Sequence, residues 1–521
     1  MIATGDWMTP RLNGIPHYHK PPFSYWMAGG GMSLFGLNEW GARIGLALAG
    51  VFALWGTSVI ARRAFSGDNG DAGADAATPG AEAAAPGAAA TTPGAEAATP
   101  GAMALLAPLV LASSLLFFIL SRQLASDAFL AAAVVGFWVA HMSPRYRHGV
   151  LPLAALGLGF FIKGPVVFLH TLVPALVGAW IARDRAPIRS FAQDRGWLLF
   201  AAIGLGWYVV EALRVPGLAR YWIQNQLWER YATTVHHRGG PWYYFAAALV
   251  AGALPWTAAV VAGAWADAKR AARLSYPRAA LFAWLVLPPL FFSTSGSKLA
   301  TYVLPEMPAV AIFAAYALRR GVAWARVSAA ILAAIAIGIE IAGPAAWAKL
   351  ESAQGVVGSG LPWPLHLAAA VMVAAALALA ARRLATGAAL TVAAWLLVIG
   401  AARTCEVGLG APRTLVARLR TELEDRDAVI EYRWFHAGLP FYLRRSIPML
   451  EVPRELDFDA PAAERAMLTR DEARTILTAH KRVWVYAPKG ATAPLASDLG
   501  GRVVPWETWR GREVARIEAI E

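Results

Sequence analysis

Lysines beside proline or glycine are the residues of this chain that are best placed for chemistry. In the stretch HYHKPPFSYW, Lys20 stands before two prolines, and a residue before proline avoids the helical region. The lysine is therefore presented stiffly, as a phosphate ligand would be, with His17 and His19 beside it as metal ligands or proton carriers. On spacing alone, an interfacial anchor whose lysine reaches the headgroups is an equal alternative.

Three further stretches place charged side chains at breaks between apolar runs. In SRQLASDAF, Arg122 and Asp127 either pair with each other or bind a phosphate and a sugar hydroxyl or cation, respectively. In FFIKGPVV, a Gly-Pro step directly after Lys163 predicts a helix break. In STSGSKLATYVLPEMPA, a Ser/Gly-rich turn precedes Lys298 and Tyr302 at the start of an apolar run. Together these residues favour a site for an anionic lipid headgroup.

The segment 214–241 is basic and rich in aromatic residues, which is typical of a helix in the membrane interface. Within it, Arg230 and Arg238 could bind an acceptor phosphate, or they could contact ordinary anionic lipids. His236 becomes a metal ligand only if it meets His19 in space.

The elements that must position these residues are membrane helices. Of the 521 residues 57% are apolar and only 16% are charged, so the chain is a polytopic membrane protein. The net charge of +13 comes from short basic clusters between apolar runs, which indicates cytoplasmic loops rather than nucleic-acid binding. A single cysteine, Cys405, excludes an internal disulfide.

We predict about twelve transmembrane helices, at 41–61, 103–121, 126–142, 150–162, 165–182, 196–213, 242–265, 279–293, 302–318, 327–345, 363–381 and 388–404.

The order of these runs divides the chain into three parts. Residues 1–40 form an outer loop with interfacial helices, 41–404 the transmembrane domain, and 405–521 an outer α/β domain, in which a capping box begins a helix. Residues 67–102 repeat Ala, Gly, Pro, Thr and Glu, so we expect a disordered cytoplasmic insert. Because the outer loop 1–40 has no apolar run before it, we expect a further helix upstream of Met1. Clusters expected on the cytoplasmic side are Arg62-Arg63, Arg145 with Arg147, Arg183 with Arg185 and Arg189, Lys269-Arg270 with Arg273, Arg319-Arg320, and Arg382-Arg383.

Several motifs resemble, in order and spacing, those of the bacterial aminoarabinose transferases. These are lipid A-modifying enzymes in the protein O-mannosyltransferase superfamily of C-type membrane glycosyltransferases. The resemblance runs from residue 1 to about 320 and is carried by HYHKPPFSYW, SRQLASDAFL, GLGFFIKGP, GALPWT and FFSTSGSKLATYVLPEMPA. It implies a polytopic α-helical protein of the bacterial inner membrane that acts on the periplasmic side. Its implied reaction moves a sugar from undecaprenyl phosphate to an envelope acceptor such as a lipid A phosphate, with inversion.

The resemblance also implies roles for single residues. Lys20 matches the lysine of the family's Lys-Pro-Pro motif and binds the donor phosphate, and Asp127 matches a second, supporting acidic position. The main catalytic aspartate of the family would lie upstream of Met1, so we expect this chain to bind the donor but to transfer sugar poorly. Relatives often carry an acidic metal ligand where this chain has His19, so a divalent metal (zinc, magnesium or manganese) held by His19 and His236 is one expectation. The remaining assignments are Arg122 and Lys298 to the donor phosphate, Tyr18, Lys163 and Tyr302 to the substrate cavity, and Arg230 and Arg238 to the acceptor.

Other functions stay open at this stage. Relatives within the superfamily glycosylate proteins or other glycans. A lipid transporter would also need many helices and membrane charges, but transporters commonly contain internal repeats, and the sequence has no such repeat. A catalytically dead, lipid-binding protein is the third alternative.

Overall fold

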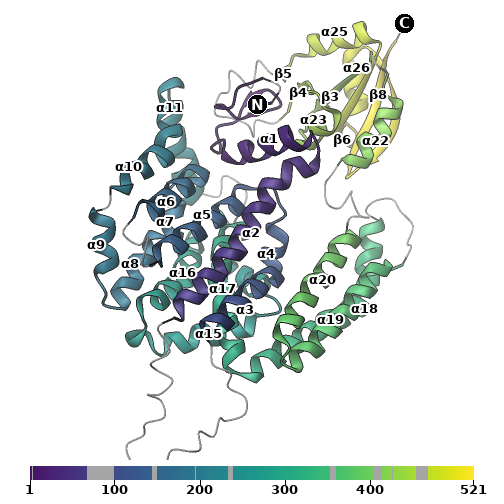
Figure 1. Cartoon of the computed structure of the whole chain (residues 1–521). Helices are drawn as coiled ribbons and strands as arrows, with labels where there is room; N and C mark the ends of the chain where they lie inside the picture. Colours follow the sequence, from purple (N-terminus) through teal and green to yellow (C-terminus); the bar gives the residue numbers. More distant parts are fainter. Residues whose placement is uncertain are drawn as a thin grey trace, which may run out of the picture.

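The computed structural model describes residues 1–520 except 3, 67–98, 144–148, 194, 233–238, 353–359, 403–411, 425 and 453–466. Most of the predicted insert 67–102, the cluster of Arg145 and Arg147, and Cys405 lie outside the described residues. The last residues of that insert are helical, because helix α3 begins at Pro100. Figure 1 shows a helical part, with the N-terminal segment and a sheet domain together at one end of it.

The helical part overlaps each of the twelve predicted apolar runs. Among the described residues, six helices are long and apolar enough to cross a membrane, or seven if one bent pair counts as a single span. Four further apolar helices of 10–17 residues are shorter than a full span. The helices are α1 (Phe23–Phe35), α2 (Glu39–Ala64), α3 (Pro100–Ser113), α4 (Leu115–Leu120), α5 (Ser126–His141), α6 (Val150–Lys163), α7 (Val166–His170), α8 (Leu172–Ile181), α9 (Ala186–Gln193), α10 (Gly196–Phe200), η2 (Ala201–Leu205), α11 (Gly206–Arg214), α12 (Leu218–Tyr221), η3 (Trp222–Glu229), α13 (Arg230–Ala232), α14 (Tyr244–Gly252), α15 (Thr257–Ala268), η4 (Ala271–Arg273), α16 (Tyr276–Ser293), η5 (Ala300–Glu306), α17 (Met307–Arg320), α18 (Val322–Ser352), α19 (Trp363–Ala380) and α20 (Leu384–Ala402).

Not every apolar run is one straight helix. The run 242–265 forms α14 and α15, which are bent by 114°; Pro255 lies in the break and has no backbone N–H to donate within a helix. The run 103–121 is divided at Ser114. A single continuous helix is therefore the wrong prediction for these two runs, because mean hydropathy does not detect such breaks.

Helix α2 has different polar groups at its two ends and is long enough to cross a membrane. At its start, Oδ1 of Asn38 accepts a hydrogen bond of 2.8 Å from the backbone N–H of Gly41, and Arg62 and Arg63 lie in its last turn. Both ends are thus stabilised by the expected polar groups. With 26 residues, α2 is about 40 Å long at 1.5 Å per residue, so the arginines lie a full membrane thickness from its start.

The C-terminal part is an α/β domain, as predicted. Its six strands have the order β5-β4-β3-β6-β8-β7, with parallel pairing from β5 to β6 and antiparallel pairing of β8 with both β6 and β7. The predicted capping box is present at Thr469 and Glu472. The elements are α22 (Arg413–Glu422), β3 (Ala428–Tyr432), α23 (Gly438–Leu443), β4 (Met449–Leu450), β5 (Met467–Leu468), α25 (Arg470–His480), β6 (Arg482–Pro488), α26 (Thr492–Leu499), β7 (Gly501–Trp509) and β8 (Arg512–Ala519).

The N-terminal segment binds this domain through a short hairpin, β1 (Arg11–Leu12) with β2 (Ile15–Pro16). In its turn, the Asn13 amide donates to the carbonyl of Ile447 at 2.6 Å and accepts from the N–H of the same residue at 3.0 Å. Ile15, which is 2% exposed, packs with Met449 and Val452. The chain just before Lys20 is therefore held by the C-terminal domain.

One buried carboxyl makes the C-terminal domain sensitive to pH. Glu431 on β3 has no exposed surface, and burial raises its pKa from 4.5 to about 8, although the backbone N–H of His436 donates to it at 2.8 Å. Between these two pKa values the folded state keeps a proton that the unfolded state loses. We therefore expect this carboxyl to lower the free energy of unfolding as pH rises from about 4.5 to about 8, by on the order of a few kcal/mol in total.

Glu431→Gln should remove this fall in the free energy of unfolding with rising pH, because an amide does not titrate. The measurement is the melting temperature of the full chain in detergent at pH 5, 6, 7 and 8, with the exposed Glu422→Gln as the control variant. An unchanged slope in Glu431→Gln would contradict the assignment.

Candidate functional site

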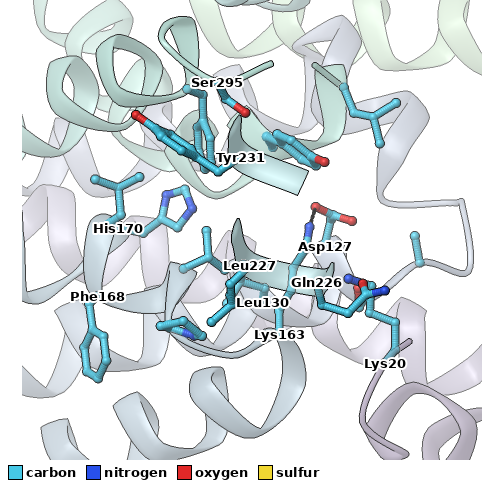
Figure 2. A pocket seen from close by; sticks show the side chains of 18 of the residues that line it. Lys20, Asp127, Leu130, Lys163, Phe168, His170, Gln226, Leu227, Tyr231 and Ser295 are labelled. Carbon is cyan, nitrogen blue, oxygen red and sulfur yellow. Dashed lines mark hydrogen bonds and ion pairs between the residues drawn. The ribbon is translucent and has the colours of Figure 1, made fainter. Parts of the chain in front are cut away.

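A cavity of about 1000 Å³ lies where the N-terminal segment meets the helical part. Its wall contains a few polar side chains in an otherwise apolar surface. Figure 2 shows Lys20 on one side, His170 on the other, and Asp127 with Lys163 between them. The lining residues are Lys20, Ser24, Tyr25, Ala28, Leu124, Ala125, Ser126, Asp127, Leu130, Lys163, Pro165, Val166, Phe168, Leu169, His170, Val173, Ile223, Gln226, Leu227, Trp228, Tyr231, Phe291, Phe292, Ser295, Leu299 and Tyr302.

The centre of the cavity holds an ion pair between Asp127 and Lys163. Asp127 lies in the first turn of α5, and Lys163 is the last residue of α6. The helix ends there because Gly164 takes φ +74°, a conformation that favours glycine, and α7 begins after Pro165. The predicted break at Gly-Pro is therefore confirmed. The Lys163 ammonium also lies 5.0 Å from the centre of the Tyr302 ring, within the range of a cation–π contact.

Lys20 reaches the same cavity from the N-terminal segment. His17 and His19 stack beside it with ring centres 4.5 Å apart, and burial together with the charge of Lys20 lowers the pKa of His17. The chain is tied down here because the indole N–H of Trp222 donates to the Tyr18 carbonyl at 2.9 Å. The ammonium group of Lys20 therefore faces the cavity. The imidazole of His17 beside it is uncharged, because its pKa is lowered.

Four predicted site residues with described side chains are not among those that line the cavity: Tyr18, His19, Arg122 and Lys298. Tyr18 is 5% exposed and packs with Phe161, Trp207 and Leu218. Arg122 donates to the carbonyl of Phe118 and lies 3.7 Å from the centre of its ring, so the predicted alternative in which Arg122 pairs with Asp127 is wrong.

Lys298 was assigned to the donor phosphate, but its ammonium faces the backbone. It donates to the carbonyls of Ser293 and Ser295 at 3.0 and 2.6 Å. These carbonyls lie at the end of α16, where the last turn of a helix lacks intrahelical donors. The lysine therefore stabilises a helix end, which local sequence could not distinguish from a ligand position.

The described residues do not make a metal site. Among them, no three His, Cys, Asp or Glu side chains lie close enough together to hold an ion. Two of the residues assigned to a metal or an acceptor, His236 and Arg238, lie outside the described part of the chain, and of Arg230 only the backbone is described. Their roles stay predictions.

Several polar lining residues were not predicted. Tyr25, whose pKa burial raises to about 12, stays a neutral phenol. Gln226 lines the cavity from η3, Tyr231 from α13, and Ser295 from the turn after α16. His170 is a single histidine within an apolar run, and an ionisable residue in a membrane segment is itself a signal of function. That signal was available in the sequence.

Comparison with known proteins finds similarity to the family that the sequence motifs resemble. Residues 19–77 match the model of the dolichyl-phosphate-mannose-protein mannosyltransferases. An undecaprenyl phosphate-alpha-4-amino-4-deoxy-L-arabinose arabinosyl transferase of Sodalis glossinidius is 29% identical over 61% of this chain and 52% of its own length. One of Pseudomonas fluorescens is 27% identical over 60% of this chain and 50% of its own. The chain thus spans about half the length of the curated relatives that it matches.

Solved structures agree in fold along nearly the whole chain. The crystal structure of ArnT from Cupriavidus metallidurans bound to undecaprenyl phosphate has a TM-score of 0.76 and 22% identity, covering 99% of this chain and 91% of that one. The apo structure of the same protein has a TM-score of 0.77. The chain therefore has the polytopic C-type glycosyltransferase fold of ArnT, a multi-pass membrane fold, and is similar in sequence to the aminoarabinose transferases of the protein O-mannosyltransferase superfamily.

Proposed function

We propose that this chain is an inverting glycosyltransferase that uses an undecaprenyl phosphate-linked sugar as its donor. It acts on the periplasmic side of the bacterial inner membrane, and a lipid A phosphate is the acceptor. The observation that carries the proposal is the composition of the cavity wall, where the charged side chains of Lys20, Asp127 and Lys163 stand in a mostly apolar surface. Such a wall suits a ligand with a long hydrocarbon chain and one anionic headgroup.

In this reaction the bond between the anomeric carbon and the lipid phosphate breaks, and the phosphate leaves with the bonding electrons. An acceptor oxygen forms the new bond from the opposite face, which inverts that carbon. Lys20 stabilises the negative charge that develops on the leaving phosphate. A lipid A phosphate is already ionised at neutral pH, so such a nucleophile carries no proton that a base must remove.

Asp127 then orients the sugar. Its carboxylate is bound to the Lys163 ammonium, which leaves lone pairs free to accept hydrogen bonds from sugar hydroxyls. The relatives support the donor class, because the transferases are named for undecaprenyl phosphate-linked aminoarabinose and the ArnT crystal structure contains bound undecaprenyl phosphate.

The test is transfer by the purified chain in lipid nanodiscs that contain lipid A and an undecaprenyl phosphate-linked aminoarabinose. Mass spectrometry should detect slow formation of lipid A heavier by one sugar residue, together with released undecaprenyl phosphate, because poor transfer is expected of this chain. The control is Lys20→Met in the same nanodiscs. If the sugar is found on protein and not on lipid A, the acceptor is a protein. Lipid movement without a new covalent bond would favour a transporter and contradict the proposal.

A further inference from the structure

A second polar cluster lies deeper in the helical part than the ion pair at the centre of the cavity. Nδ1 of His170, at the end of α7, lies 2.7 Å from Oε1 of Glu306, at the end of η5. The indole N–H of Trp138 on α5 donates to the His170 carbonyl at 3.1 Å. Among the described residues, neither carboxyl oxygen of Glu306 nor Nδ1 of His170 makes a hydrogen bond of standard geometry, so the 2.7 Å ion-pair distance is their contact.

The burial of this cluster argues against a direct role in binding a ligand. His170 is 1% exposed and Glu306 has no exposed surface, although the His170 ring belongs to the cavity wall. A carboxylate oxygen and an unprotonated imidazole nitrogen repel each other at 2.7 Å, so this pair must carry a proton on one of its two members. Such a pair is costly in a membrane segment, and its persistence there suggests a function.

This cluster joins α5, α7 and η5, and the polar residues at the centre of the cavity lie on α5, α6 and η5. Helix α5 carries Asp127 and Trp138. Lys163 and His170 stand on either side of the helix break, at the ends of α6 and α7.

Tyr302 and Glu306 are both in η5. Lys163 contacts Asp127 and faces the Tyr302 ring, and it lies close enough to act electrostatically on the Glu306 carboxyl. The two levels thus share α5 and η5, and their third elements, α6 and α7, adjoin at the helix break.

We propose that His170 and Glu306 are positioning residues, which hold α7 and η5 at the spacing that Lys163 needs to contact Asp127 and Tyr302 together. The test by transfer rate rests on the proposed function. The test by the positions of Lys163, Asp127 and Tyr302 does not. The break at Gly164-Pro165 explains the need, because without continuous helix hydrogen bonds α6 and α7 must be fixed to each other by other contacts.

The decisive variant replaces both residues, His170→Phe with Glu306→Leu. Exchange of a buried polar pair for apolar residues of similar volume is often neutral for stability, so the melting temperature should stay close to wild type. Affinity for undecaprenyl phosphate should also be unchanged within about threefold, since Lys20 is untouched. The maximal transfer rate should fall at least tenfold, because small misplacements of a reacting group are costly.

His170→Asn is the conservative variant, because its amide can donate from a position near that of Nδ1. It should restore most of the transfer rate. Tyr276→Phe is the matched control: it removes a buried contact between the Tyr276 hydroxyl and Nε2 of His141 elsewhere in the helical part. This control should cost stability without a selective loss of rate.

An electron cryomicroscopy structure of the double variant separates this inference from the proposed function. Displacement of Lys163 from Asp127 or from Tyr302 supports positioning, even if the wild-type chain transfers no sugar. An unchanged arrangement of these three side chains would overturn the inference, as would a double variant with the wild-type transfer rate.

Discussion

Replacing Lys20 with methionine should weaken the binding of undecaprenyl phosphate by about ten- to a hundredfold. Lys20 lines the cavity, and the two prolines after it hold its backbone in place. A hydrogen bond to a charged group contributes about 1.5–3 kcal/mol, and each 1.4 kcal/mol changes the dissociation constant about tenfold. The measurement is titration of undecaprenyl phosphate into the detergent-solubilised chain by native mass spectrometry.

The control for this variant is Lys489→Met, which removes an exposed lysine of the C-terminal domain and so reports any effect of net charge alone. The effect of Lys20→Met should also be larger at low salt, although screening is weaker in a partly enclosed site. Equal dissociation constants for Lys20→Met and Lys489→Met would remove Lys20 from the donor site.

The second large effect should come from breaking the ion pair between Asp127 and Lys163. The two side chains are each 11% exposed, so Asp127→Asn leaves a buried ammonium without its carboxylate. Loss of one partner of a buried pair destabilises a protein by about 3–5 kcal/mol. We expect a clear drop in melting temperature, together with a loss of transfer of at least a hundredfold.

The double variant Asp127→Asn with Lys163→Met distinguishes stability from chemistry. With both charges gone, no unpaired charge is buried, so the melting temperature should recover most of the loss, whereas transfer should stay low. Thermal melting and the maximal transfer rate of the four proteins form a double-mutant cycle. Additive losses of stability in the double variant would mean that the pair is not coupled.

The sequence alone determined where the membrane segments lie and which residues were worth considering. Apolar runs identify membrane helices because the bilayer requires about twenty apolar residues for each span. The Gly-Pro break after Lys163 and the capping box at Thr469 are local features, and both are present. Of the residues proposed from the sequence, Lys20, Asp127, Lys163 and Tyr302 line one cavity.

The partners of these residues were decided only by the tertiary structure. Asp127 pairs with Lys163 from another helix and not with Arg122, which is nearer in sequence, and Lys298 binds carbonyls of its own turn. The contact of His170 with Glu306 likewise joins residues far apart in the chain. Sequence patterns specify which groups must be satisfied when a segment is buried. Which partner satisfies each group depends on how the helices pack, because a buried charge binds the complementary group that packing brings within reach.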